Sequence, residues 1–273
     1  MRFVCLMLIV VCFTRCNASN SDHANDTRKT DSAWKLSWSE EFNYTGLPDS
    51  TKWSYETGGN GWGNNELQYY TSASPLNVQV SNGTLKLSAI KQKMENREYT
   101  SARLVTRGKK DFTYGRIEIR AKLPPGRGLW PAIWMLGSNI AAVGWPMSGE
   151  IDIMEHVGYE KDSVLATIHT DAYNHVKGTQ KTKKTFIADP YTAFHNYWIE
   201  WTPEYMDFYK DSTLYNHIVN EHKTKKEWPF DDPFFLVLNI AVGGNLGGKY
   251  GVDTSVFPGT MEVDYVRVYT KEK

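Results

Sequence analysis

The chain has 273 residues, with 31 Lys and Arg balanced by 31 Asp and Glu, and 14% of its residues are aromatic. A formal net charge of +0 offers no basic surface for nucleic acid, and a hydrophobic fraction of 41% excludes both a disordered chain and a membrane protein of many spans. The length is ordinary for a single all-β domain. The aromatic content is the feature to explain, because Trp and Tyr fill cores and also stack on flat ligands.

The first 16 residues have the pattern of a signal peptide. Arg2 supplies a positive start, and residues 3–13 form an apolar run that is too short to span a membrane. All three cysteines lie in this segment, at positions 5, 12 and 16, so a chain that loses it keeps at most one Cys and no internal disulfide. We therefore expect an exported protein that is stabilised by packing alone.

Cys16 favours one form of processing. The apolar run and residues 13–16 resemble a loose lipoprotein box, in which Cys16 is lipidated and becomes the new N-terminus, although Arg15 stands where a small residue is usual. Cleavage nearby with loss of Cys16 is the alternative. Residues 17–32 are polar without apolar periodicity and are predicted to be a flexible tether. The protein is thus expected to be secreted or held at the outer surface, with Cys16 as its only link to a membrane.

Residues 33–273 are predicted to form one domain of short β-strands. The strand candidates either alternate polar and apolar residues or are continuously apolar; they are residues 84–90, 115–121, 197–201, 234–242 and 261–269. Turn residues separate them, and no long helical pattern, internal repeat or linker interrupts the region. Many short strands in one long domain favour an all-β sandwich or jelly roll.

The most informative motif is a run of three acids, Glu150, Asp152 and Glu155. On a regular strand, Glu150 and Asp152 share one face, whereas Glu155 falls on the apolar face, where a carboxylate is costly. A single bulge at Ile153 or Met154 resolves this conflict, because it brings Glu155 onto the face of the other two acids.

Three like charges on one face destabilise a sheet, so the arrangement indicates chemistry. Cleavage of a glycosidic bond needs a protonated carboxyl that donates to the leaving oxygen and an ionised carboxylate on the other side of the sugar carbon. With the bulge, the two Glu side chains can approach the separation of about 5–5.5 Å that a retaining mechanism uses. Crowding raises the pKa of at least one of the acids. A solvated acidic strand is the alternative that the pattern alone leaves open.

Two neighbouring segments favour a carbohydrate groove. Trp130 and Trp134 stand close together just upstream of the acids, and indole rings stack on the apolar faces of sugars. Residues 61–70 add a Gly-rich loop with several amides, which are side chains that bind sugar hydroxyls. A core role for one of the two Trp, and a surface turn for the loop, are the alternatives.

Taken together, these residues resemble glycoside hydrolase family 16, and within it the laminarinases, which are endo-β-1,3-glucanases. Residues 150–155 are similar to the active-site strand of the family in its bulged form. Ten stretches match in order along the predicted domain: residues 38–42, 61–70, 101–103, 115–118, 129–136, 149–158, 168–169, 199–203, 239–244 and 263–268. Such a collinear set is far more specific than any one motif.

The resemblance implies a β-jelly roll of two curved antiparallel sheets with a substrate cleft on the concave face. It implies that Glu150 is the nucleophile, Glu155 the acid/base and Asp152 the assisting residue of a retaining double displacement, with no cofactor. It also places the following residues near bound sugar: Trp130, Trp134, Asn65, Glu66, Arg103, His169 and Trp145.

Two further expectations rest on the resemblance. Many members of the family hold a structural calcium on the convex side, and the corresponding positions here are Glu41, Gly83 and Asp264, whose side-chain or backbone oxygens are hard ligands. Leu246 stands where the family often has a Trp, so one stacking platform is expected to be missing.

The sequence thus predicts a monomeric enzyme that acts on a β-1,3-glucan such as laminarin. Mixed-linkage β-1,3-1,4-glucan stays open as the substrate, because both groups share the bulged motif. From another class, a non-catalytic glucan-binding lectin on the same fold is the alternative. That alternative requires a missing carboxylate, whereas Glu150, Asp152 and Glu155 are all present.

Overall fold

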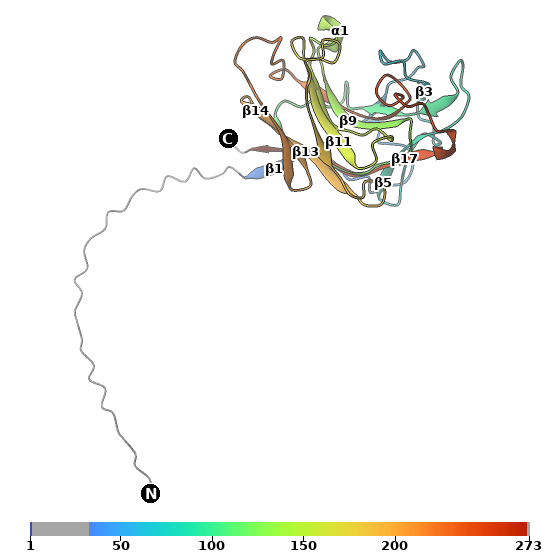
Figure 1. Cartoon of the computed structure of the whole chain (residues 1–273), viewed down its shortest axis with the longest axis horizontal. Coiled ribbons are helices and arrows are strands. Elements are labelled where there is room, and N and C mark those ends of the chain that lie inside the picture. Colours follow the sequence, from blue (N-terminus) through green and yellow to red (C-terminus); the bar gives the residue numbers. More distant parts are fainter. Residues whose placement is uncertain (2–32, 272–273) are drawn as a thin grey trace, which may run out of the picture. The chain divides into compact units, whose positions relative to one another are not determined.

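The computed structural model describes Met1 and residues 33–271, and Ala33–Lys273 is a compact unit of its own. In this unit, two antiparallel sheets stack face to face, as a jelly roll requires (Figure 1). The predicted all-β class is confirmed. The predicted signal peptide, Cys16 and the tether of residues 17–32 lie outside the described residues.

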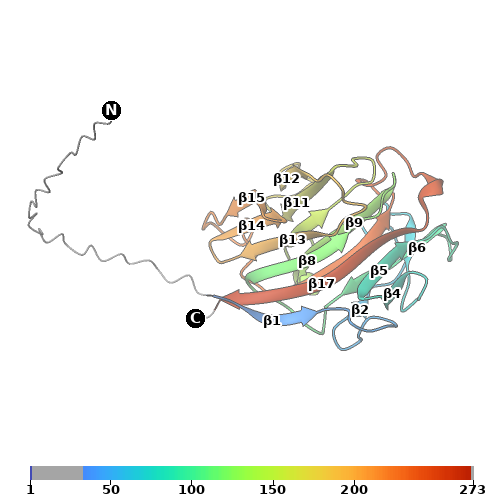
Figure 2. The same ribbon diagram turned by 90° about the horizontal axis from the view of Figure 1, so that it is seen from below.

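The first sheet has the strand order β15-β14-β13-β8-β17-β5-β4, and β1 pairs with β17 (Figure 2). Its strands are β1 (Trp34–Glu40), β4 (Val78–Ser81), β5 (Thr84–Ala89), β8 (Gly115–Lys122), β13 (His195–Trp201), β14 (Tyr205–Lys210), β15 (Thr213–Val219) and β17 (Gly259–Lys271). The strands predicted from alternation at residues 84–90, 115–121 and 261–269 all belong to this sheet.

The second sheet has the order β12-β11-β10-β9-β16-β7-β2. Its strands are β2 (Ser54–Tyr55), β7 (Arg103–Val105), β9 (Leu129–Gly137), β10 (Glu150–Glu155), β11 (Ser163–His169), β12 (Lys181–Phe186) and β16 (Phe234–Val242). A short parallel pair, β3 (Gln68–Tyr70) and β6 (Tyr99–Ser101), and two single-turn helices, α1 (Ile140–Val143) and η1 (Thr254–Val256), complete the unit. Within the described residues, no helix is long and apolar enough to cross a bilayer.

Strand β16 shows how the second sheet separates core from site. Leu236, Leu238 and Ile240 are fully buried in the core between the sheets. The alternate residues point to the opposite face, where Val237 joins a small apolar cluster and Asn239 lines a cleft. All nine residues of this strand are buried, which explains why its sequence is an almost continuous apolar run without polar alternation.

Several of the aromatic residues serve the core. Trp53 and Trp201 are 2% and 0% exposed. Trp38 packs against the core, and its ring meets the rings of Trp53 and Phe112 edge-on at centroid distances of 6.2 and 5.5 Å. Core positions for Trp38 and Trp201 therefore leave other Trp residues free to line a binding surface.

Replacement of Leu238 by Ala should lower the free energy of unfolding by about 2–5 kcal/mol, because it opens a cavity where the two sheets meet. The matched control is Leu214→Ala on β15, whose side chain is 46% exposed, and which should change the free energy of unfolding by less than about 0.5 kcal/mol. Urea denaturation followed by Trp fluorescence measures both. Equal effects of the two substitutions would contradict the assignment of Leu238 to the core.

Candidate active site

A bulge brings the three acids of β10 onto one face of the second sheet. Asp152 and Met154 pair with consecutive residues of β9, so Ile153 is the extra residue, and the pairing with β11 shifts between Asp152 and Glu155. Ile153 and Met154 are fully buried in the core. Glu150, Asp152 and Glu155 line one cleft on the opposite face. The bulge predicted at this point of the strand is confirmed.

The cleft crosses the strands and has two parts that share Glu150 and Glu155, whereas Asp152 lines the first part alone. The first part has a volume of about 320 Å³ and lies over β9, β16 and β7; it is lined by Trp62, Asn64, Glu66, Arg103, Trp130, Trp134, Trp145, His175 and Asn239, among others. The second part has a volume of about 280 Å³ and lies over β11 and β12; its walls include Leu165, Thr167, His169, Gln180, Thr182 and Leu246. Leu246, at the position where the family often has a Trp, lines the second part.

Glu150 and Glu155 each accept a hydrogen bond from an indole. The Nε1 group of Trp145 donates to Oε2 of Glu150, and that of Trp130 donates to Oε1 of Glu155, both at 3.0 Å. An N–H donor stabilises an ionised carboxylate and fixes its orientation. The two indoles therefore position the acids in addition to forming apolar walls of the cleft.

Asp152 lies between Glu150 and Glu155 along β10, and His169 stands opposite Glu150 on the neighbouring strand β11. The Nε2 atom of His169 lies 3.4 Å from Oδ2 of Asp152 and 3.7 Å from Oε1 of Glu150. Asp152 is 4% exposed, and neither its Oδ2 atom nor Nδ1 of His169 has a hydrogen-bond partner in the described part of the chain. Buried polar atoms of this kind can form a hydrogen bond with a substrate hydroxyl or with water.

Burial raises the pKa of each of the three acids to about 8. For Glu150 and Glu155 this value of about 8 includes a second, smaller increase in pKa from the charge of Asp152, and decreases in pKa from His169 and from the indole hydrogen bonds. Three carboxylates this close together do not all ionise near neutral pH. The cluster therefore retains a proton that can be donated, as general acid catalysis requires.

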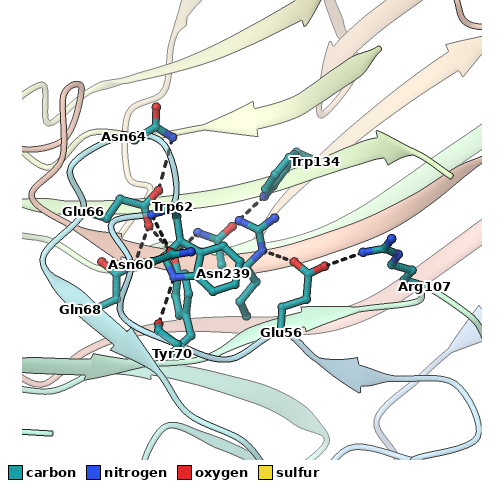
Figure 3. Close-up of polar contacts among 12 residues, drawn as sticks. Glu56, Asn60, Trp62, Asn64, Glu66, Gln68, Tyr70, Arg107, Trp134 and Asn239 are labelled. Carbon is teal, nitrogen blue, oxygen red and sulfur yellow. Dashed lines mark hydrogen bonds and ion pairs between the residues drawn. The ribbon is translucent and has the colours of Figure 1, made fainter. Parts of the chain in front are cut away.

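A hydrogen-bond chain holds the wall of the first part of the cleft (Figure 3). The Nε1 group of Trp134 donates to Asn239 at 2.7 Å, and the Asn239 amide donates to the Tyr70 hydroxyl at 2.9 Å. The Tyr70 hydroxyl and the Gln68 amide both donate to Oε2 of Glu66, at 3.2 and 2.6 Å. The chain fixes the ring plane of Trp134 and the carboxylate of Glu66 before any ligand binds.

Arg103 is held between two indole rings. Its guanidinium carbon lies 4.7 Å from the ring centroids of both Trp62 and Trp134. Its Nε group also donates to Glu56 at 2.7 Å, and Arg107 pairs with the same Glu56 at 3.5 Å (Figure 3). The guanidinium is therefore fixed in orientation, with cation–π contacts on both faces.

The structure places most of the predicted sugar-binding residues on the cleft. Glu66, Arg103 and the three Trp residues line its first part, and His169 lines the second. Asn65 does not line either part: it has a φ of 56° and its amide donates to Asn245 at 2.8 Å. Its neighbour Asn64 lines both parts instead. The sequence reasoning missed Asn64, Asn239 and His175, although Asn239 stands in a stretch that matched the family.

The side chains at the predicted calcium position do not fit a calcium site. Both carboxylate oxygens of Glu41 accept from Arg267, at 3.0 and 2.8 Å, and Asp264 accepts from Arg120. Gly83 lies in the turn between β4 and β5 with a φ of 74° and offers only backbone oxygen. Among the described residues, the single His, Asp and Glu group whose donor atoms converge is Glu150, Asp152 and His169. A calcium held by backbone oxygens at Glu41, Gly83 and Asp264 stays a prediction.

The chain is similar to known glucanases over most of its length. A β-glucanase from Rhodothermus marinus is 55% identical over 243 residues, which cover 86% of this chain and 85% of that protein. The X-ray structure of the laminarinase from Rhodothermus marinus aligns with a TM-score of 0.87 at 53% identity, covering 88% of this chain and 99% of the other. The crystal structure of a non-specific endo-β-1,3(4)-glucanase aligns with a TM-score of 0.83 at 48% identity, covering 89% and 92%.

The sequence pattern of the glycosyl hydrolases family 16 matches residues 65–267, which include the three acids and all the residues that line the two parts of the cleft except Trp62, Gly63 and Asn64. This range is more than half of the chain, and the fold and the bulged strand agree with it. The chain belongs to glycoside hydrolase family 16.

Proposed function

We propose that this protein hydrolyses internal β-1,3-glucosidic bonds of laminarin-like glucan with retention of configuration. The observation that carries the proposal is the bulged strand that sets Glu150, Asp152 and Glu155 on the floor of a Trp-lined cleft. The cleft has two parts on either side of the acids, as cleavage within a chain requires. Similarity to a β-glucanase and to a laminarinase supports a β-glucan as the substrate.

The residues divide the reaction into two steps. First, Glu155 donates its proton to the leaving glycosidic oxygen while the Glu150 carboxylate attacks the anomeric carbon, which gives a glycosyl ester on Glu150. Then Glu155, now ionised, takes a proton from water, the water oxygen attacks the anomeric carbon and the ester bond breaks. Glu155 is protonated again and Glu150 is free. Asp152, between them, moderates the charge that each carries.

Mixed-linkage β-1,3-1,4-glucan is the second candidate substrate. One of the similar structures is a non-specific endo-β-1,3(4)-glucanase. In this chain Leu246 lines the second part of the cleft, so no aromatic ring at this position restricts which linkage can bind there. A lectin without catalysis is disfavoured, because all three carboxylates line the cleft.

We further propose that the protein is exported, attached through Cys16 if the lipoprotein box is used, and that it acts as a monomer. The proposals of export and of attachment rest on the pattern of residues 1–32, and the proposal of a monomer rests on the compact unit Ala33–Lys273.

Glu150→Ser should abolish release of reducing sugar from laminarin while glucan binding survives, because the nucleophile is lost and the cleft walls stay. Glu155→Gln should lower kcat by about 10²–10⁴-fold, as expected for the loss of a general acid/base. Glu200→Gln, on the first sheet, is the matched control and should leave kcat unchanged. Proton NMR of early product should show the β anomer. No product from laminarin or lichenan with the unsubstituted protein would refute the proposal, and an initial α anomer would refute retention.

The hydrogen bond from Trp130 lowers the pKa of Glu155 against the larger effect of burial. Trp130→Phe keeps an aromatic ring but removes the donor, so the pKa of Glu155 should rise. Since Glu155 must be protonated to act as the acid, the basic limb of the kcat/KM profile should move to higher pH. Trp134→Phe is the control, because its indole donates to Asn239 and touches neither catalytic Glu. An unmoved limb in Trp130→Phe would show that the indole acts only as a wall.

The buried acids should make the protein less stable as pH rises. Asp152 has a pKa raised from 3.8 to about 8 by burial, so between these pH values the folded state holds a proton that the unfolded state has lost, and each increase in pH favours unfolding. Asp152→Asn removes the contribution of this carboxyl group to the pH dependence of stability. Its Tm relative to the unsubstituted protein should therefore rise between pH 4 and pH 8 and level off above. A difference in Tm that is constant across this window would contradict the raised pKa.

A further inference from the structure

A second groove lies outside the catalytic cleft, beyond the end of β10. It has a volume of about 620 Å³, and none of its lining residues lines either part of the cleft. Its walls come from three loops that are distant in the sequence and from Tyr191; the lining residues are Pro125, Gly126, Arg127, Gly158, Tyr159, Lys161, Tyr191, Tyr250, Asp253 and Val256. Gly158 and Tyr159 follow the acid/base Glu155 by three and four positions.

Close backbone contacts fix the loops that form this groove. A Cβ atom added to Gly158 would lie 1.7 Å from the carbonyl oxygen of Gly126, and one added to Gly126 would lie 2.5 Å from Cβ of Val256. The Asp253 N–H donates to the carbonyl of Arg127 at 3.0 Å, and Nη1 of Arg127 donates to the carbonyl of Tyr250 at 2.8 Å. The groove is thus a preformed surface whose three loops cannot separate without loss of these contacts.

The groove presents aromatic rings to solvent. Tyr250 is 56% exposed, and its ring meets the ring of Tyr159 edge-on at a centroid distance of 4.9 Å. The hydroxyl of Tyr191 is held by Nε2 of His156 at 3.1 Å. Nζ of Lys249 lies over the ring of Tyr250, 5.3 Å from its centroid, on a flexible side chain that a ligand can displace. An exposed Tyr with a fixed backbone then offers a ring face for stacking at little cost in conformational entropy.

The charged residues around the rings favour a neutral ligand. Arg127 and Lys161 line the groove together with Asp253. Glu160 and Asp162 flank Lys161 in the sequence, and Glu160 is paired with Lys184. Cations and acids therefore alternate along the groove and provide hydrogen-bond donors and acceptors without a strong field of one sign. A neutral, hydroxyl-rich chain with apolar ring faces fits this combination of rings and mixed polar groups.

We propose that the groove binds a second segment of β-glucan, next to the segment held in the catalytic cleft. This inference rests on the proposed function, which makes a polymer the substrate. Tyr159 follows Glu155 by four positions, so the groove begins where the strand that carries the acids ends. A chain or branch that leaves the cleft past the end of β10 would reach Tyr159 and Tyr250. Binding at two places on one polymer strengthens attachment without a new contact in the cleft.

The test compares a polymer with a ligand too short to occupy both places. In the Glu150→Ser background, which removes hydrolysis, the affinities for laminarin and for laminaritriose are measured with Tyr250, Tyr250→Ala and Tyr250→Phe. Loss of one stacking ring should weaken laminarin binding by about threefold to tenfold. It should leave laminaritriose binding unchanged, and Tyr250→Phe should retain the affinity for laminarin because the ring remains. Leu36→Ala on β1, with a side chain that is 49% exposed, is the control for a surface truncation and should change neither affinity.

Three results would overturn the inference: an unchanged affinity for laminarin in Tyr250→Ala, an equal loss for both ligands, or a loss in Tyr250→Phe as large as in Tyr250→Ala. The first result would mean that the groove binds no glucan. The second would mean that Tyr250 acts on binding in the catalytic cleft, and the third would mean that the ring of Tyr250 does not stack on the ligand. Failure of the proposed function is a different result, since then the Glu150→Ser protein binds neither ligand and the unsubstituted protein releases no sugar.

Discussion

The burial of three carboxylates on one packed strand is the constraint on which the rest of this structure depends. Strand β10 lies in the middle of the second sheet, and its other face must supply core residues. A regular strand cannot satisfy both demands, because Glu155 would then lie in the core. The extra residue Ile153 solves the conflict, since Ile153 and Met154 both enter the core while Glu155 joins Glu150 and Asp152 in the cleft. The site therefore exists through an irregularity in the sheet.

The aromatic content of the chain is explained by several different tasks. Trp53 and Trp201 fill the core. Trp130 and Trp145 each donate a hydrogen bond to one Glu of the cleft, Glu155 and Glu150 respectively, so their N–H groups counter part of the destabilisation that burial imposes on the ionised form. Trp134 is held by its hydrogen bond to Asn239. Its ring also makes a cation–π contact with Arg103, as does the ring of Trp62. An indole suits these positions because it combines an apolar face with a donor at its edge.

Local features of the sequence were sufficient for the strands, the acids and the bulge, because each is encoded within a few neighbouring residues. Alternation gives the faces of a strand, and the clash of Glu155 with its apolar neighbours indicates a bulge near Ile153. Contacts between distant segments were not predictable in this way. Arg103 meets Glu56 and Asn239 meets Tyr70 only because the topology brings β7 next to the segment after β2, and β16 next to β3. For the same reason, no pattern distinguished Asn64 from Asn65, whose side chains diverge at a positive φ.

The bulged strand also leads from the acids of the cleft into the loops beyond it. After Glu155 the chain continues through His156, which is fully buried, donates from Nδ1 to the carbonyl of Ser163 and has Nε2 at 3.1 Å from the Tyr191 hydroxyl. It then reaches Gly158, which has no room for a side chain against Gly126. A shift of one residue in this strand would move Glu155 to the core face. Glu155, which lines the cleft, and Tyr159, which lines the second groove, are four positions apart on this one segment. The backbone that leaves the bulged strand therefore leads directly from one binding surface to the other.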